Sequence, residues 1–187
     1  MNIYDFDNTI YQGDSTINFY LYCLRKKPVI IRFLPKQLIA FLLHAMKKIS
    51  TEELKETFFC FLPAIEDPES MIEAFWNRNI QKIRPWYMKG SQSNDLIISA
   101  SPAFLVGPAC KRLNIAEPIA TCMDIRTGKI HGINCKGHEK VRRLVEQYGH
   151  VQIESFYSDS LSDSPLASMA KHAYLVGKKG MAQWPEA

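Results

Sequence analysis

The apolar residues of this chain follow two different periods. At the N-terminus and again after residue 93 they form short runs, which helix-periodic stretches separate. Short runs of this kind predict buried strands, here residues 3–4, 95–99, 118–123, 151–157 and 173–176. The stretches between them predict helices over 102–113, 138–148 and 167–171, and a Thr-Gly turn predicts a small hairpin over 125–130. Strands and helices therefore alternate in the second half of the chain.

Between residues 12 and 88 the pattern predicts helices alone. A first helix has Asp14 or Ser15 as its N-cap and ends at about residue 27. Ser50 and Glu53 have the spacing of a capping box, which predicts a helix to about residue 61. Asp67 starts a further helix that ends near residue 84. This part of the chain is therefore expected to be all-helical.

The most apolar stretch, residues 29–46, approaches the length of a membrane-spanning helix. Pro35 interrupts it, and Arg32, Lys36 and His44 fall on one helical stripe. A charge at the centre of a span costs roughly 2.5–3.5 kcal/mol on insertion scales, so the pattern favours a bent amphipathic helix or a helical hairpin. Such a segment either packs within a helical subdomain or lies on a membrane interface.

The order of these elements predicts an α/β fold with a mostly parallel sheet. A lone strand is not stable, so the N-terminal strand has to join the sheet of the second half. The helical block then becomes an insert that leaves the sheet directly after its first strand. We expect an α/β core of residues 1–11 and 89–187 and a helical cap of residues 12–88. Since ligands bind at the carboxyl ends of parallel strands, the cap is expected to cover the site.

Composition and charge narrow the class of protein. A hydrophobic share of 47% and a charged share of 22% are ordinary for a globular domain. The start Met1-Asn2-Ile3-Tyr4-Asp5 lacks the basic and apolar regions of a signal peptide. The five cysteines are scattered and odd in number, which favours reduced thiols in a cytoplasmic protein over a zinc site.

The net charge of +4 is unevenly distributed. Between Asp14 and Glu52 there is no acidic residue, whereas this interval holds seven cations: Arg25, Lys26, Lys27, Arg32, Lys36, Lys47 and Lys48. A basic block is usually a solvated face, but it also fits a phosphorylated substrate, a membrane surface or a partner. Peripheral membrane contact through residues 24–48 is one of these alternatives. Nucleic acid is not expected, because no stacking motif accompanies the charges.

Two carboxylates follow the first predicted strand. Asp5 and Asp7 are two residues apart, and in an extended segment such residues point the same way. Burying both is costly unless a cation lies between them. Mg²⁺ is the expected cation, because it prefers oxygen ligands and often links carboxylates to a substrate phosphate. The alternative is a turn, in which Asp and Asn are common.

Other polar residues follow later strands at the same edge of the sheet. Ser99 ends one strand just before a helix start, where a hydroxyl and backbone amides can bind an anion or simply cap the helix. Asp159 and Asp163 follow another strand and fit either a shared metal site or a turn. A lysine, Lys136 or Lys140, starts the helix between them and either reaches the site or lies exposed. Carboxylates, a cation, hydroxyl donors and a lysine are together the components of phosphoryl transfer.

In order and spacing these residues resemble the four motifs of the haloacid dehalogenase superfamily of phosphatases, over nearly the whole chain. Asp5-Phe6-Asp7-Asn8-Thr9 resembles the first motif and Ser99-Ala100-Ser101 the second. Lys140, or Lys136, matches the third, and Asp159 to Asp163 the fourth. The helical insert resembles the type-one cap of the phosphoserine-phosphatase-like branch. The resemblance therefore implies a Rossmann-like core and a Mg²⁺-dependent phosphomonoester hydrolase.

The resemblance also implies a role for each matched residue. Asp5 would be the nucleophile that forms an aspartyl-phosphate, and Asp7 the general acid and base. Asp5, Asp7 through its carbonyl, Asp159 and Asp163 would hold Mg²⁺. The phosphoryl group would be bound by Ser99, the Ala100 amide and a lysine. Lys140 is favoured, because Gly137-His138-Glu139-Lys140-Val141 fits the pattern of this branch, and Lys136 is the alternative.

Two departures leave the substrate open. Asp14 stands where phosphoserine phosphatases usually carry Glu, and Ala100-Ser101 where they carry two glycines. The basic, apolar cap resembles that of the phosphatidylglycerophosphatase C type. We therefore expect a phosphorylated small molecule, with Asp14 in its binding region, or alternatively a lipid phosphate. A phosphotransferase, or a non-catalytic module that binds anions or a membrane surface, is a further alternative.

Overall fold

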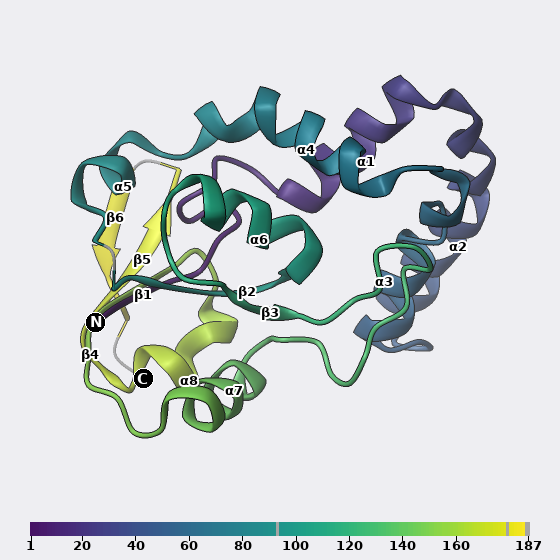
Figure 1. Ribbon diagram of the computed structural model, residues 1–187. Coiled ribbons are helices and arrows are strands. Elements are labelled where there is room, and N and C mark those ends of the chain that lie inside the picture. Colours follow the sequence, from purple (N-terminus) through teal and green to yellow (C-terminus); the bar gives the residue numbers. More distant parts are fainter. Residues whose placement is uncertain (93, 179, 186–187) are drawn as a thin grey trace.

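The computed structural model describes residues 1–92, 94–178 and 180–185. Its centre is a six-stranded sheet with the order β3-β2-β1-β4-β5-β6 (Figure 1). The strands are β1 (Asn2–Tyr4), β2 (Leu96–Pro102), β3 (Ile119–Thr121), β4 (Ile153–Ser158), β5 (Ala170–Gly177) and β6 (Gly180–Gln183). Neighbouring strands from β3 to β5 are parallel, and β6 runs antiparallel to β5. The predicted α/β class and mostly parallel sheet are confirmed.

Eight α-helices accompany this sheet in the described residues. Five precede β2: α1 (Ser15–Lys26), α2 (Leu34–Ala45), α3 (Thr51–Phe58), α4 (Pro68–Asn79) and α5 (Pro85–Gly90). Three follow it: α6 (Ala103–Arg112), α7 (His138–Tyr148) and α8 (Ser164–Ala167). Short 3₁₀ helices lie at Pro28–Phe33, Leu62–Ala64, Ile80–Lys82 and Leu161–Asp163.

Alternation along the central strands creates two separate cores. Ile3 and Leu96 belong to the cluster that α7 and α8 cover, whereas Tyr4 and Ile97 belong to the cluster on the other face, with α6. Successive residues of a strand point to opposite faces, so β1 and β2 each supply both clusters. The strands are apolar on both sides because helices cover both faces, as in other parallel sheets.

The helical insert leaves the sheet and returns to it at one narrow place. A β-bridge pairs Tyr11 with Ile83, and the backbone amides of Gln12 and Arg84 donate to the carbonyls of Lys82 and Ile10. Local signals set the helix starts. Asp14 caps α1 by accepting from the Ile17 amide, and the predicted capping box of Ser50 and Glu53 is formed at the start of α3. The division into core and cap remains a prediction, but both ends of the insert lie side by side.

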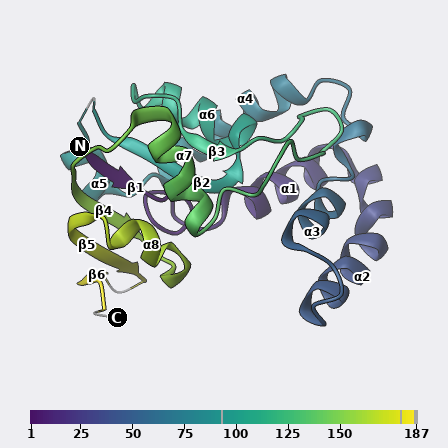
Figure 2. The ribbon, with the colours of Figure 1, turned by 90° about the horizontal axis from the view of Figure 1, so that it is seen from below.

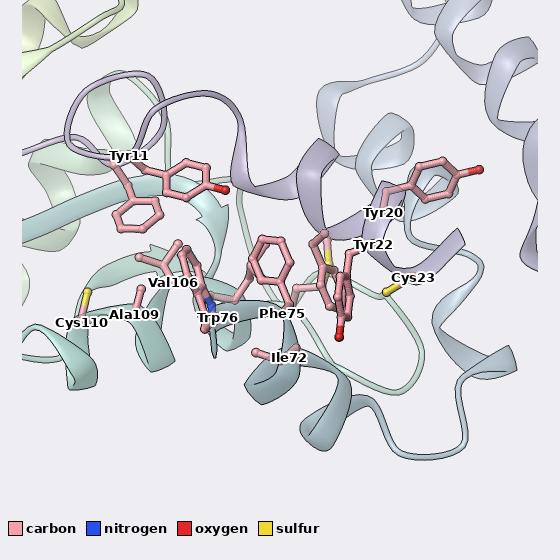
Figure 3. Close-up of a cluster of buried hydrophobic side chains, with 14 of the residues drawn as sticks. Tyr11, Tyr20, Tyr22, Cys23, Ile72, Phe75, Trp76, Val106, Ala109 and Cys110 are labelled. Carbon is pink, nitrogen blue, oxygen red and sulfur yellow. The ribbon is translucent and has the colours of Figure 1, made fainter. Parts of the chain in front are cut away.

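Part of the insert packs closely on the core. Trp76 of α4 is fully buried and its indole N–H donates to the carbonyl of Leu105 in α6, 2.8 Å away. Figure 3 shows Trp76 beside Val106 and Ala109 of α6, and Phe75 of α4 beside Tyr22 of α1, within one cluster. Helix α5 begins within the range predicted as cap, yet its Tyr87 packs edge-on against Tyr4 of β1. The sheet and the inner side of the insert therefore share a core.

The apolar stretch 29–46 forms two elements, a 3₁₀ helix Pro28–Phe33 followed by α2. The change from 3₁₀ to α helix falls between Phe33 and Leu34, directly before Pro35, which lies in the first turn of α2. By length and composition alone, Pro28–Ala45 could cross a membrane. Its outer face is exposed.

Three local predictions were wrong. Residues 167–171 were predicted as helix, but α8 starts earlier, at Ser164-Pro165, and β5 already begins at Ala170, where it pairs with β4. The predicted hairpin at 125–130 is a turn closed by a single bridge, Met123 to Ile130. The helix from Asp67 ends at Asn79, and a new helix begins at Pro85. Pairing of β5 with its neighbour and the rigid φ of proline override the local helical pattern at these places.

Candidate active site

The register of the three central strands brings the first, second and fourth motifs to one edge of the sheet. Tyr4 of β1 is level with Ile97 of β2 and with Tyr157 of β4. Asp5, Ser99 and Asp159 lie one or two residues beyond these three positions, and therefore lie near the same edge of the sheet. They line a pocket of about 320 Å³ together with Asp7, Lys140 and Asp163. The expected convergence at the carboxyl ends of the strands is observed.

A buried lysine links the first motif to the fourth. The Nζ of Lys140, in the first turn of α7, lies 2.7 Å from Oδ1 of Asp5 and 2.7 Å from Oδ2 of Asp163. Lys140 is 1% exposed, and both carboxylates are buried as well. Burial alone would lower the pKa of the lysine, but the two carboxylates outweigh it and raise that pKa. Burial also raises the pKa of Asp5, against the attraction of Lys140.

Asp7 sits at the N-terminus of α1. One carboxylate oxygen accepts from the backbone amide of Ser15 at 2.6 Å, and the other accepts from the hydroxyl of Ser101. Burial and the neighbouring charge of Asp14 raise the pKa of Asp7 to about 7, although both hydrogen bonds act in the opposite direction. A carboxyl group that titrates near neutral pH is suited to both donate and accept a proton.

A threonine fixes the fourth motif relative to the first. The hydroxyl oxygen of the fully buried Thr9 accepts from the Asp159 amide at 3.0 Å, and the same hydroxyl lies 3.5 Å from Oδ2 of Asp5. Burial and repulsion by Asp5 raise the pKa of Asp159 to about 6. The Asp5 and Asp159 carboxylates therefore occupy one site where their charges destabilise each other.

The second motif lies opposite, on the strand end that leads into α6. Ser99 is buried, and its hydroxyl accepts from the amide of Ser101 at 3.1 Å. The carbonyl of Ala100 accepts from the hydroxyl of Thr121 at 2.6 Å. A register shift of β2 against β3 occurs between Ser99 and Pro102, so the regular pairing is interrupted where this strand end lines the pocket.

The two candidate lysines have different surroundings in the structure. Lys140 reaches the carboxylates, whereas Lys136 is exposed and lines the rim of the pocket. Asp14 lines the same pocket with its carboxylate engaged in capping α1. All residues predicted for the site are thus brought together, with Lys136 and Asp14 farther from the two carboxylates that Lys140 bridges.

The sequence analysis missed a cap lysine in the pocket. The Nζ of Lys55, on α3, donates to the carbonyl of Ala100 at 2.7 Å and to Oδ1 of Asn134 at 2.6 Å. Burial and repulsion by Lys136 lower the pKa of Lys55 to about 8. No local signal distinguishes this lysine, because it is one charged residue among several on an amphipathic helix. Only the fold brings it to the second motif.

The donor set of the pocket fits a small cation. Five carboxylates line the pocket, against three lysines. In the described part of the chain, no group of three or more His, Cys, Asp and Glu side chains is arranged to hold a metal by itself. Lys140 already occupies the position between Asp5 and Asp163. Mg²⁺ typically uses one or two carboxylates, other oxygens and water, so Asp5 and Asp159 with a backbone carbonyl are a sufficient set.

The chain belongs to the family of haloacid dehalogenase-like hydrolases, whose pattern matches residues 3–168. Protein CicA of Caulobacter vibrioides strain NA1000 / CB15N is 31% identical over 116 residues, which are 59% of this chain and 47% of CicA. The chain thus spans about half the length of this curated relative.

Solved structures share the fold. A protein of unknown function from Bordetella pertussis Tohama I superposes with a TM-score of 0.76 at 19% identity, covering 92% of this chain and 87% of that chain. A phosphoserine phosphatase, solved as a phospho-aspartyl intermediate analogue, superposes with a TM-score of 0.54 at 14% identity, covering 91% of this chain and 83% of that chain. The family match confirms the predicted superfamily of enzymes. The structural matches confirm the predicted fold, that of phosphoserine-phosphatase-like proteins.

Proposed function

We propose that this protein is a Mg²⁺-dependent phosphomonoester hydrolase that acts through an aspartyl-phosphate on Asp5. One observation carries the proposal: Asp5 is a buried carboxylate held by Lys140 in a pocket that Asp7, Ser99 and Asp159 also line. A nucleophile, an acid, hydroxyl donors and a cation within one pocket fit phosphoryl transfer. The phospho-aspartyl analogue described for a phosphatase of the same fold adds support.

In the proposed first step an oxygen of Asp5 attacks phosphorus, and the bond from phosphorus to the ester oxygen breaks. Asp7 protonates the departing alcohol, which its pKa of about 7 permits at neutral pH. In the second step Asp7 takes a proton from water as the water attacks the phosphoryl group. The bond to Asp5 breaks, and inorganic phosphate is released. Lys140, Ser99 and the Ala100 amide stabilise the phosphoryl oxygens in both steps.

Asp5, Asp159 and the Asp7 carbonyl would hold Mg²⁺, with Asp163 acting through water or by orienting the other ligands. The ion supplies electrostatic stabilisation of the phosphoryl oxygens when bound. Thr9 accepts from the amide of Asp159, and Lys140 pairs with Asp5. These contacts position the two residues whose carboxylates would bind the ion directly. The charge balance of the pocket supports this role, because the carboxylates outnumber the lysines.

We expect Asp5→Asn to keep the fold and to abolish turnover, with a loss on the order of 10⁴-fold or more. The measurement is phosphate release from a panel of phosphomonoesters that includes phosphoserine and a phosphatidylglycerophosphate, with Mg²⁺ and with EDTA. Circular dichroism of the variant checks its fold. Retained activity in Asp5→Asn would exclude the mechanism. Beryllofluoride binding without turnover of any substrate would favour a non-catalytic anion-binding module.

A lipid phosphate is a second candidate substrate, and a specific cavity favours it. An apolar cavity of about 170 Å³ adjoins the site pocket and shares Asp14, Thr16 and Lys55 with it. Its other walls are apolar: Ile17, Phe41, Leu54, Phe58, Phe59 and Pro102. A small polar leaving group leaves these walls in contact with water, whereas an acyl chain or glycerol ester would cover them.

The same substrate panel separates the two candidates when Leu54→Ser is added. For a lipid substrate this change should lower kcat/KM on the lipid phosphate at least tenfold, because Leu54 of α3 lines the apolar cavity. Turnover of phosphoserine should stay within twofold of the wild type. Equal effects on both substrates, or turnover of phosphoserine alone, would exclude the lipid candidate.

A further inference from the structure

The outer face of the cap carries a large exposed apolar surface. Its members, here called the outer cap face, lie on the 3₁₀ helix, on α2 and at the residue that follows α2: Val29, Ile31, Leu34, Leu38, Ile39, Phe41, Leu42 and Met46. Leu38 is 53% exposed and Leu42 65%. Figure 2 shows α2 at the end of the molecule that is farthest from β5 and β6. Isolated exposed apolar residues are normal, but a contiguous group of this size marks an interaction site.

Helix α2 turns a polar side chain toward the protein and apolar side chains toward solvent. Gln37 is 2% exposed, and it accepts from the hydroxyl of Tyr20 at 2.9 Å and donates to the carbonyl of Phe58 at 2.7 Å. The Nδ1 of His44 lies 3.1 Å from the carbonyl of Ile49, in the segment that follows α2. The helix therefore buries the polar Gln37 against the protein and leaves leucines outside, together with Lys36. A helix of a water-exposed cap would do the opposite.

Basic residues surround the outer cap face. Arg32 and Lys36 lie within it, Arg25 and Lys26 end the preceding helix, and Lys47 and Lys48 follow Met46. All six are exposed. Among the ion pairs of the described residues, the basic block takes part in one alone, Lys27 with Glu66 at 3.3 Å. The surface thus combines apolar side chains with positive charge, and the partner has to be both apolar and anionic.

We propose that the outer cap face docks the protein on an anionic lipid bilayer, with the 3₁₀ helix and α2 lying in the interface. Leucines and Phe on one side with Lys and Arg around them are typical of interfacial helices, and anionic lipid adds attraction for each basic residue near the surface. The segment lies on the bilayer instead of crossing it, because Gln37, Ile30 and Ala40 are packed against the cap. A second copy of the chain is disfavoured, since a two-fold interface would bring the same cations face to face. The inference does not depend on the proposed function.

The test is co-sedimentation of the full chain with vesicles of phosphatidylcholine, with and without one fifth phosphatidylglycerol. We expect binding to the anionic vesicles that weakens with salt, as for any surface held partly by charge. Leu38→Ser with Leu42→Ser should weaken binding at least tenfold. The matched control is Met88→Ser with Met181→Ser, whose residues are exposed to similar degrees (54% and 45%) on other elements, and it should bind like the wild type.

Charge is tested separately. Arg32→Gln with Lys36→Gln should weaken binding by about fivefold for each charge removed. Lys89→Gln with Lys111→Gln removes the same charge elsewhere on the surface and should change vesicle binding by less than twofold. Circular dichroism of each variant checks that the fold is kept. The proposal fails if the wild type does not bind anionic vesicles, or if the leucine variant binds as well as its control. A dimer in solution that the leucine variant abolishes, without vesicle binding, would assign the face to self-association instead.

Discussion

Lys140 is the buried cation on which the arrangement of the acidic residues depends. Its Nζ is 2.7 Å from carboxylate oxygens of both Asp5 and Asp163, so it offsets two negative charges that are themselves out of water. Lys136 lies four residues earlier and is exposed. Sequence left the choice between these lysines open, because both lie near the start of the same helix. Burial distinguishes them.

This difference predicts opposite results for two matched variants. Lys140→Met leaves Asp5 and Asp163 buried without a cation, so the free energy of unfolding at pH 7.5 should fall by about 3–5 kcal/mol. Lys136→Met should change it by less than about 0.5 kcal/mol, as for other exposed positions. Urea denaturation in EDTA measures both values. Equal stability of the two variants would mean that the buried ion pairs do not form.

At the scale of elements, the turn of residues 124–129 that follows β3 packs against the cap. The carboxylate of Asp124 accepts from the amides of Arg126 and Thr127, and Lys129 pairs with Glu56 of α3 at 2.7 Å. Gly128 in this turn has φ +72°, and a Cβ there would come 2.7 Å from the carbonyl oxygen of Phe59. The turn therefore needs glycine for two reasons, its backbone angle and the close approach of the cap.

Two glycine variants separate these reasons. Gly132 also has positive φ, +88°, but a Cβ there would meet nothing within 4 Å. Gly132→Ala should therefore cost about 1–2 kcal/mol of stability, from the backbone conformation alone. Gly128→Ala should cost more and should loosen the contact between the turn and the cap. Thermal unfolding gives the order of stability, and hydrogen exchange of α3 reports the contact. A smaller loss of stability for Gly128→Ala than for Gly132→Ala would contradict the close approach of the cap to Gly128.

At the scale of the whole molecule, the acidic pocket makes stability depend on pH and on Mg²⁺. The pKa of Asp7 is raised from 3.8 to about 7 and that of Asp159 to about 6, in both cases first by burial. In the absence of metal the folded protein thus holds protons that the unfolded chain releases near pH 4. This contribution to stability is fully present below pH 4 and is lost as the pH rises to about 7.

We therefore expect the melting temperature in EDTA to fall between pH 5 and pH 8. Mg²⁺ would compete with the proton on the Asp159 carboxylate, so it should raise the melting temperature more at pH 8 than at pH 5. Thermal scans at both pH values, with Mg²⁺ and with EDTA, measure the effect. Asp7→Asn should flatten part of the slope in EDTA, which separates Asp7 from other titrating groups. A larger effect of Mg²⁺ at pH 5 would contradict the proposed site.

Local sequence patterns were sufficient to predict the class of fold and the edge of the sheet at which the site forms. Strand and helix periods are local properties, and in a parallel sheet the carboxyl ends of the strands share one edge. Asp5, Ser99 and Asp159 could therefore be assigned to one site before their geometry was known. Helix starts such as Asp14 and Ser50 were also predictable, because a cap acts on residues three positions away.

Tertiary structure alone decided how these groups are paired. Lys140 contacts a carboxylate 135 positions away in the chain, and Lys55 contacts Asn134 across 79 positions. It also decided that Gln37 faces inward while Leu38 and Leu42 face outward, since hydrogen bonds to Tyr20 and Phe58 fix the orientation of α2. Hydrophobic pattern predicts that a helix is amphipathic but assumes that its apolar side is buried. Which side meets the protein depends on partners that the fold brings from distant parts of the chain.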